Sequence, residues 1–255
     1  MRAVVNVATG TRFIRGQQRL TAWLAQHSED YLHWNDRTGL PAGSPSHQDV
    51  PYAFKAYALK CAVEKGATTL LWCDASIIPI RPVGELWTRI ERDGYWIGNN
   101  GFSNYEWTAD LSYVDLFASM FLWEESNALE CARAVNRHIP HVVATSFGLS
   151  LKHPIGQQIF DEYYRLASET EAFCGPWFNE LQIRHAMPHS ELIEWIKSGK
   201  CAPCGPPDVR GHRHDQTALS VIAWRLGCQL TNSPEVFSYR GGENEKTILV
   251  ADGAY

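Results

Sequence analysis

The sequence predicts an α/β fold in which a mostly parallel central sheet is covered by helices on both faces. Short apolar runs alternate along the chain with longer segments whose apolar residues recur at helical spacing. Such alternation is typical of parallel strands joined by crossover helices. The chain has 255 residues, of which 45% are hydrophobic, and this is enough to bury one large core. We therefore expect a single domain over residues 1–255.

The first half of the chain shows the alternation most clearly. Ala3–Ala8 is an apolar run that stops at Thr9 and Gly10, and it predicts a strand. Gly16–Gln26 carries apolar residues at helical spacing and predicts a helix. A strand, a long polar loop and a second helix are expected to follow, at Asp30–Trp34, Asn35–Asp49 and Pro51–Lys65. The loop is long enough to act as a functional flap.

The second half is less regular. Apolar residues on one side predict helices at Val83–Arg92, Ala128–Arg137, Ile155–Ala167 and about Asp215–Leu226. Extended segments are expected at Tyr95–Gly98, Val142–Leu151 and Gln229–Leu230. Residues 99–125 are aromatic and residues 175–211 break the pattern, so the sequence leaves both segments unassigned.

Charge and composition exclude several classes of protein. The net charge is -5 and there is no run of lysines and arginines, so we expect no nucleic-acid partner. No apolar run approaches the roughly 20 residues that a transmembrane helix needs, and the first ten residues lack the features of a signal peptide. We therefore expect a soluble cytoplasmic protein whose seven cysteines are mostly reduced core thiols.

The most informative segment is TTLLWCDAS at Thr68–Ser76. Thr69–Trp72 is too short and too evenly apolar for an amphipathic helix, so it predicts a buried strand with Asp74 at its carboxyl end. Ligands of open α/β sheets bind outside the carboxyl ends of the strands. A carboxylate there can hold a divalent cation bound to a diphosphate. The alternative is that Asp74 only caps a turn before the extended residues 77–82.

Several segments, in this order and spacing, resemble nucleotide-sugar-dependent glycosyltransferases of the GT-A fold. They are ATG at Ala8–Gly10, the helix bearing Lys55, LLWCDAS, ATSFGLSLKHP at Ala144–Pro154 and HRHDQTALS at His212–Ser220. The resemblance extends from Met1 to about Leu230. It implies one Rossmann-like domain with a donor-binding half at about 1–110 and an acceptor-side half at about 111–255. It also implies a nucleoside-diphosphate sugar as donor, and a glycan or another hydroxyl compound as acceptor.

The same resemblance implies a metal ion. Such enzymes typically carry Asp-x-Asp after the fourth strand, where carboxylates and Mn²⁺ or Mg²⁺ hold the diphosphate. Here the motif is Asp74-Ala75-Ser76, so a hydroxyl replaces the second carboxylate. We expect Asp74 to bind the metal together with phosphate and water, Ser76 to add a weak contact, and His214 or His212 to ligate the metal or contact the diphosphate. Cationic side chains and helix N-termini are the alternative means of neutralising the leaving group.

The resemblance places the reacting centre at Asp215. If the enzyme inverts the anomeric carbon, Asp215 is the candidate base for the acceptor hydroxyl, and if it retains configuration, Asp215 positions the sugar. The alternative is that Asp215 caps the N-terminus of the helix that it begins. The remaining donor contacts are expected from Thr9, Gly10, Arg12, Lys55, Asn99 and Gln216.

A rival interpretation concerns the irregular segment before that helix. Cys201 and Cys204 form a C-x-x-C, and His212 and His214 follow within a dozen residues. These are the ligand types of a structural Zn²⁺ site, although an ordinary surface loop is the simpler alternative. Two further functions therefore stay open: a noncatalytic nucleotide or sugar binding protein on the same fold, and a zinc-stabilised interaction module.

Overall fold

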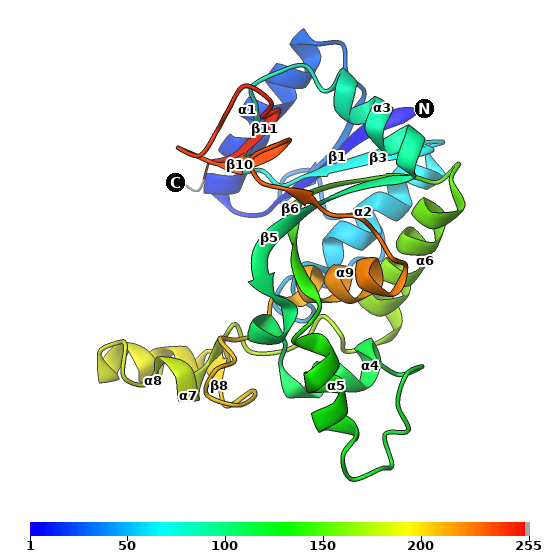
Figure 1. Ribbon diagram of the computed structural model, residues 1–255. Coiled ribbons are helices and arrows are strands. Elements are labelled where there is room, and N and C mark those ends of the chain that lie inside the picture. Colours follow the sequence, from blue (N-terminus) through cyan, green and yellow to red (C-terminus); the bar gives the residue numbers. More distant parts are fainter. Residues whose placement is uncertain (253–255) are drawn as a thin grey trace.

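The computed structural model describes residues 1–252, and its centre is a six-stranded sheet in the order β2-β1-β3-β6-β5-β9 (Figure 1). The strands are β1 Arg2–Ala8, β2 Tyr31–Asn35, β3 Thr69–Cys73, β5 Tyr95–Ser103, β6 Pro140–Ser150 and β9 Thr231–Asn232. Within this sheet β6 runs antiparallel to both of its neighbours, β3 and β5, whereas the other neighbouring strands pair in parallel. The prediction of a mostly parallel α/β sheet is confirmed.

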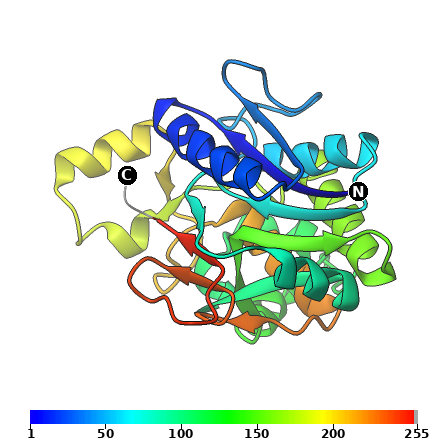
Figure 2. The same ribbon diagram turned by 90° about the horizontal axis from the view of Figure 1, so that it is seen from above.

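Helices cover both faces of the sheet because successive side chains of each strand point to opposite sides. Val4 of β1 belongs to the core under α1 and α3, whereas Ala3 and Val5 belong to the core under α2, α6 and α9. Figures 1 and 2 show these two layers of helices on either side of the strands. The helices are α1 Thr11–Gln26, α2 Ala53–Glu64, α3 Gly84–Asp93, α6 Pro154–Glu169 and α9 His214–Arg225.

The predicted elements agree with these bounds to within a few residues, with three differences. Helix α1 begins five residues earlier than its periodicity predicted, at Thr11. Strand β5 continues to Ser103 through two irregularities in its pairing with β6. These interrupt the alternation of side chains, so the pattern indicated the strand only as far as Gly98. The last strand of the sheet is Thr231–Asn232 rather than the expected Gln229–Leu230.

A second, three-stranded sheet lies beside α1 and was not predicted. It consists of β4 Ile77–Pro79, β10 Phe237–Tyr239 and β11 Leu249–Ala251, in the order β10-β11-β4. Strand β11 runs antiparallel to β4, and the Asp252 amide donates to the Ser76 carbonyl at 3.0 Å. This pairing brings the end of the described chain to the turn that carries Asp74.

Two regions lie outside the layered core. The first contains the short helices η1 Asn104–Trp107, η2 Asp110–Ser112 and α4 Tyr113–Leu116, followed by α5 Ala128–Asn136. The second is an arm that projects from the sheet (Figure 1), formed by β7 Phe178–Asn179, α7 Glu180–Ile183, α8 His189–Lys197 and β8 Cys201–Ala202. Across residues 1–252 we find no helix with the length and apolar character that membrane crossing requires.

Candidate functional site

A cavity of about 170 Å³ lies at the carboxyl ends of β1 and β3. We call it the strand-end cavity, and its lining residues are Val7, Thr9, Phe13, His47, Tyr52, Phe54, Asp74, Ala75 and Ser76. They come from the two strand ends, the first helix, the long loop after β2 and the start of α2. The sheet therefore brings together three of the predicted donor-binding residues: Thr9, Asp74 and Ser76.

The Asp74 backbone is fixed on both sides. Its amide donates to the Thr145 carbonyl of β6 at 2.8 Å, and its carbonyl accepts from the Ile77 amide at 2.9 Å. The side chain is 28% exposed and lines the cavity, and its Oδ1 accepts from the indole Nε1 of Trp72 at 2.7 Å. The turn after β3 is thus closed by backbone groups, which leaves the carboxylate directed at the cavity.

Lys55 of α2 holds Asp74 and Asp215 together. Its Nζ lies 3.1 Å from Oδ1 of Asp74 and 2.9 Å from Oδ2 of Asp215, and it donates to the Ala144 carbonyl at 2.9 Å. The rings of Tyr52 and Trp72 lie near the same ammonium, with centroids at 5.0 and 5.4 Å. Burial alone would lower the pKa of Lys55, but the two carboxylates outweigh it and raise the pKa above its usual value. Lys55 is therefore a buried cation between two acids.

Asp215 lies in the first turn of α9 and is 3% exposed. Burial raises its pKa to about 6; Lys55 opposes this shift and Asp74 adds to it. The N-cap residue of α9 is Arg213, whose side chain makes no capping hydrogen bond within the described chain, and the Gln216 backbone amide favours the charged form of Asp215 within the same first turn. Neither Asp215 nor Lys55 lines the strand-end cavity, so Asp215 is linked to the cavity through Lys55 and then Asp74. Its predicted role as the acceptor base stays a prediction.

Buried amides brace the strand ends beneath the cavity. Asn6 of β1 donates from Nδ2 to the Cys73 carbonyl at 2.6 Å and accepts from Gln17 of α1 at 2.6 Å. Gln17 in turn accepts from Nδ2 of Asn35 at 2.7 Å and donates to the Trp34 carbonyl at 2.9 Å. Buried amides are costly unless they are hydrogen-bonded. This satisfied network ties β1, β2, β3 and α1 together where the ligand would bind.

Helix α1 approaches the Asp74–Ser76 turn so closely that only glycine fits at position 16. A Cβ on Gly16 would lie 2.1 Å from the Ala75 carbonyl oxygen. Gly10 directly precedes the first residue of α1. It has a φ of 81°, and its amide donates to Asp36. Gly10 thus serves the backbone at the start of α1, as glycine does where a left-handed conformation is needed.

An aromatic cluster at the mouth of the cavity was not predicted. Tyr52 has a left-handed backbone with a φ of 61°, and its amide donates to Nδ1 of His47 at 3.1 Å. The ring of Trp177 lies 5.5 Å from that of Tyr52, 5.7 Å from that of His47 and 4.6 Å from that of His214. The sequence feature that could have indicated this cluster is the position of His47 in the long loop 35–49, which we interpret as a functional flap. That loop folds against the start of α2.

Three other predicted donor contacts lie elsewhere. Asn99 of β5 donates to Asn232 at 3.1 Å and accepts from the Gly101 amide, so it serves the β5–β9 edge. Gln216 donates to the Val142 carbonyl and so fixes α9 to β6. Arg12 lines a separate cavity beside the strand-end cavity. Asn99 and Gln216 are thus engaged in structural hydrogen bonds within residues 1–252.

The predicted metal ligands are not gathered into one group. Across residues 1–252, no three or more His, Cys, Asp or Glu side chains are placed to hold a metal ion. His214 is buried with Nδ1 at 2.9 Å from the Phe173 carbonyl, and burial lowers its pKa well below the usual value. Nε2 of His212 lies 2.9 Å from the Ala172 carbonyl. Cys201 and Cys204 are buried thiols. The four-residue zinc cluster is therefore not formed by the described part of the chain.

The residues at Asp74 also fit a divalent cation poorly. Hard cations need several oxygen ligands, and the second carboxylate of the motif is replaced by Ser76. Oδ1 of Asp74 already accepts from Trp72 and faces Lys55. A divalent ion on this carboxylate would lie beside the Lys55 ammonium, which would repel it.

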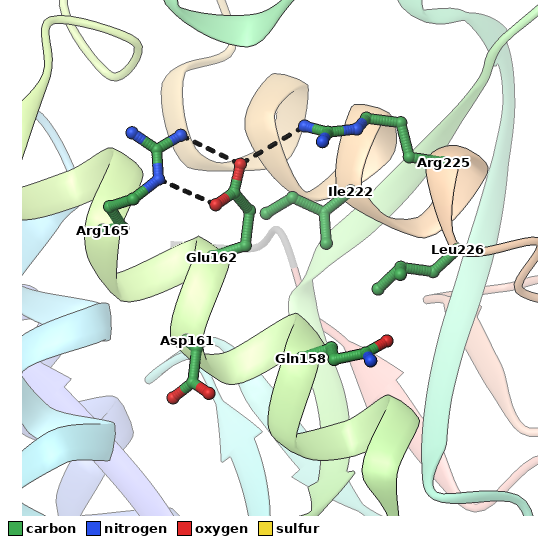
Figure 3. Close-up of a pocket in the computed structure, with 7 residues that line it drawn as sticks. All are labelled: Gln158, Asp161, Glu162, Arg165, Ile222, Arg225 and Leu226. Atoms are coloured by element: carbon green, nitrogen blue, oxygen red, sulfur yellow. Dashed lines mark hydrogen bonds and ion pairs between the residues drawn. The ribbon is translucent and has the colours of Figure 1, made fainter. Parts of the chain in front are cut away.

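A larger cavity of about 390 Å³ lies between α6 and α9 (Figure 3). We call it the helix groove; it is lined by Gln158, Asp161, Glu162, Arg165, Ile222, Arg225 and Leu226. Glu162 pairs with Arg165 at 2.8 Å and with Arg225 at 3.3 Å, as the dashed lines in Figure 3 mark. Glu162, Arg165 and Arg225 are thus paired with one another, and the groove shares no lining residue with the strand-end cavity.

Comparison with known proteins gives matches at the level of structure only. No family model and no curated protein matches the sequence. Among solved structures, a glycosyltransferase involved in the glycosylation of the major capsid of PBCV-1 is similar over 100% of this chain and 93% of its own, with 8% identity and a TM-score of 0.42. Mouse xyloside xylosyltransferase 1, in its apo form, is similar over 100% of this chain and 98% of its own, with 9% identity and a TM-score of 0.44. Both neighbours are glycosyltransferases. Identities and TM-scores this low identify no donor, acceptor or reaction for this chain.

Proposed function

We propose that this protein is a glycosyltransferase that moves a sugar from a nucleoside-diphosphate sugar to an acceptor hydroxyl. The proposal rests on the position of Asp74, a partly exposed carboxylate at the carboxyl end of β3. Lys55 forms ion pairs with both Asp74 and the buried Asp215. Glycosyl transfer proceeds through a positively charged sugar, and a fixed carboxylate stabilises that charge. The motifs that resemble GT-A enzymes converge on this same group of residues.

The donor nucleotide would enter the strand-end cavity. Thr9 and Gly10 follow β1, where the chain turns into α1, and Phe13 is an aromatic residue of the lining that is 40% exposed, with the Arg12 guanidinium 5.7 Å from its ring centroid. Aromatic faces stack on bases and sugar rings. Behind Asp74, the rings of Tyr52 and Trp72 lie near the Lys55 ammonium, with centroids at 5.0 and 5.4 Å.

The acceptor would bind in the neighbouring loop cavity. This space of about 560 Å³ shares His47 with the strand-end cavity, and its lining is His47, Gln48, Asp49, Pro51, Cys174, Gly175, Trp177, Ser198, Gly199 and Lys200. Polar groups around one indole ring suit a glycan, because hydroxyl groups need hydrogen bonds while sugar faces pack on aromatic rings. His47 would then lie between donor and acceptor.

A turnover assay tests the proposal. The protein is incubated with a panel of nucleoside-diphosphate sugars and glycan acceptors, and release of the nucleoside diphosphate is measured. Asp74→Asn should lower kcat by 10²-fold or more while the protein stays folded, because it removes a charge near the developing cation. Arg225→Gln, in the helix groove, is the matched control and should leave turnover unchanged.

The same assay separates an enzyme from a noncatalytic binding protein. An enzyme loses turnover on Asp215→Asn while donor binding largely survives. A binding protein shows a rise in apparent melting temperature with nucleoside diphosphates but no turnover with any donor in the panel. Absence of both binding and turnover would contradict the proposal.

A further inference from the structure

We propose that Arg12 and Arg15 of α1, in place of a divalent cation, bind the diphosphate of the donor. This inference rests on the proposed function and specifies how the same site neutralises the negative charge of its ligand. It begins from a second cavity beside the first, which we call the arginine cavity. Its lining is Arg12, Phe13, Arg15, Gly16, Arg19, Ala75, Ser76 and Asp252.

The arginine cavity carries an excess of positive charge. Arg12, Arg15 and Arg19 recur at a spacing that places them along one face of α1, and they line a space of about 240 Å³. Asp252 supplies the carboxylate of this lining, and it lies 3.6 Å from Arg19 and 2.7 Å from Arg240. Guanidinium groups bind phosphate oxygens through two parallel N–H bonds, so this lining suits a phosphate or diphosphate group.

The two cavities form one continuous binding surface. They share Phe13, Ala75 and Ser76, the last two from the turn that carries Asp74. Their volumes of about 170 and 240 Å³ are each below the roughly 300 Å³ at which ligand pockets usually begin. A nucleotide would therefore extend over both, with Ser76 at the junction.

The start of α1 adds to the attraction for an anion. Its first turn contains no acidic residue and its N-cap residue, Gly10, has no side chain, although the Asp36 carboxylate accepts a hydrogen bond from the Gly10 amide. The amino end of a helix carries partial positive charge and amides that lack helical partners. Arg12 lies in that first turn, with its guanidinium 5.7 Å from the Phe13 ring centroid, and Arg15 lies on the next turn, whereas Arg19 lies farther from the amino end of the helix. We therefore assign the phosphate contacts to Arg12 and Arg15.

The alternative means of neutralising the diphosphate is a metal ion at Asp74, and the site argues against it. Lys55 already lies 3.1 Å from the carboxylate oxygen that accepts from Trp72. That ammonium reduces the repulsion between Asp74 and an incoming diphosphate, and it weakens the attraction of Asp74 for a second cation. The charge missing from the Asp-Ala-Ser motif is supplied instead by α1.

Binding measurements test this assignment. A panel of nucleoside diphosphates and inorganic pyrophosphate is titrated calorimetrically into the protein, in EDTA and in Mn²⁺. We expect equal affinity under both conditions. Arg15→Gln should weaken nucleoside diphosphate binding about tenfold and Arg12→Gln/Arg15→Gln about 100-fold, since hydrogen bonds to charged groups are strong. Arg225→Gln is the control of equal charge change and should bind like the unmodified protein.

The possible outcomes separate this inference from the function on which it depends. Binding that is lost in EDTA, or that survives in the double arginine variant, overturns the role of α1 and leaves the proposed function standing. If no member of the panel binds in either condition, the proposed function and the inference fall together. Thermal unfolding of each variant shows whether it is folded, and because Arg15 is exposed, Arg15→Gln should melt like the unmodified protein.

Discussion

Two clusters of charged side chains in this protein have opposite composition and opposite surroundings. At the strand-end cavity one ammonium, that of Lys55, lies between two carboxylates, and its side chain is 3% exposed. In the helix groove one carboxylate, that of Glu162, lies between the guanidinium groups of Arg165 and Arg225 (Figure 3). In that second cluster the side chains are 26% to 40% exposed.

The difference shows why the buried cluster is the better candidate for function. Water can replace either partner of an exposed ion pair, so such pairs contribute about 0–1 kcal/mol. A buried ammonium without its partners has no such replacement, and the penalty for breaking the pair is larger. The protein therefore holds Asp74 and Asp215 in a fixed relation through Lys55. Four experiments test the contrast between the two clusters.

Lys55→Met should give the largest effect. Removing the ammonium leaves Asp215 buried without a counterion, so we expect a loss of about 3–5 kcal/mol in the free energy of unfolding at pH 8. At pH 5 the loss should be smaller, because Asp215 can then take up a proton. Urea unfolding at both pH values measures the difference.

A double variant provides the control for that result. Lys55→Met/Asp215→Asn removes both charges of the buried pair, so it should recover part of the stability that Lys55→Met loses. A loss of equal size in the single and the double variant would show that Lys55 stabilises through packing against Tyr52 and Trp72 instead of through charge.

The pH dependence of stability should identify Asp215. Its pKa is about 6 in the folded protein and near 3.8 when unfolded, so the unfolded chain releases this proton first as pH rises. The stabilisation that the Asp215 carboxyl gives the folded state is therefore fully present below pH 4 and is lost as pH rises through 6. This lowers the free energy of unfolding by about 2–3 kcal/mol. The unfolding free energy of the unmodified protein minus that of Asp215→Asn should fall by this amount between pH 4 and pH 7. A constant difference would contradict the raised pKa.

The sequence predicted the layered core and the position of Asp74 at the carboxyl end of a buried strand, because both leave local patterns. Apolar periodicity marks buried faces, and the run before Asp74 ends where β3 ends. The resemblance to GT-A enzymes also named Lys55, Asp74 and Asp215 as candidate site residues, and it assigned Lys55 to a phosphate or sugar of the donor. The contact of Lys55 with both carboxylates joins α2, the end of β3 and α9. These elements lie far apart in the chain, so a pattern read from neighbouring residues cannot indicate the contact.

Other features escaped prediction for related reasons. Tyr52 adopts its left-handed backbone at the start of α2, a conformation that is rare for a bulky residue and has no sequence signature. The β4–β11 pairing joins Ile77–Pro79 to the end of the described chain. Arg12 and Arg15 precede the helix that the sequence predicted from Gly16, and the cavity that they line depends on Gly16, which lets α1 approach the turn.

Gly16→Ala tests that approach and should have an intermediate effect. The added Cβ would meet the Ala75 carbonyl at 2.1 Å, so α1 must move away from the turn. We expect a loss of about 1–3 kcal/mol in the free energy of unfolding and weaker nucleoside diphosphate binding. Gly84→Ala is the matched control, because this helical glycine has nothing within 4 Å of the Cβ position. The control should be neutral or slightly stabilising. Equal behaviour of the two variants would show that α1 does not depend on the close contact.

Glu162→Gln in the helix groove should give the smallest effect. Arg165 and Arg225 hold the pKa of Glu162 below its usual value, and its side chain is 26% exposed. The ion pairs of Glu162 thus stabilise the fold at pH values above the pKa that Glu162 has in the unfolded chain. This stabilisation is lost as pH falls through the lower pKa of the folded state. Because water screens it, we expect a loss within about 1 kcal/mol at neutral pH, reduced further by salt, in the urea unfolding measurement used for Lys55→Met. A loss comparable with that of Lys55→Met would show that burial does not distinguish the two clusters, and the reason for locating function at the strand ends would then rest on the position of Asp74 alone.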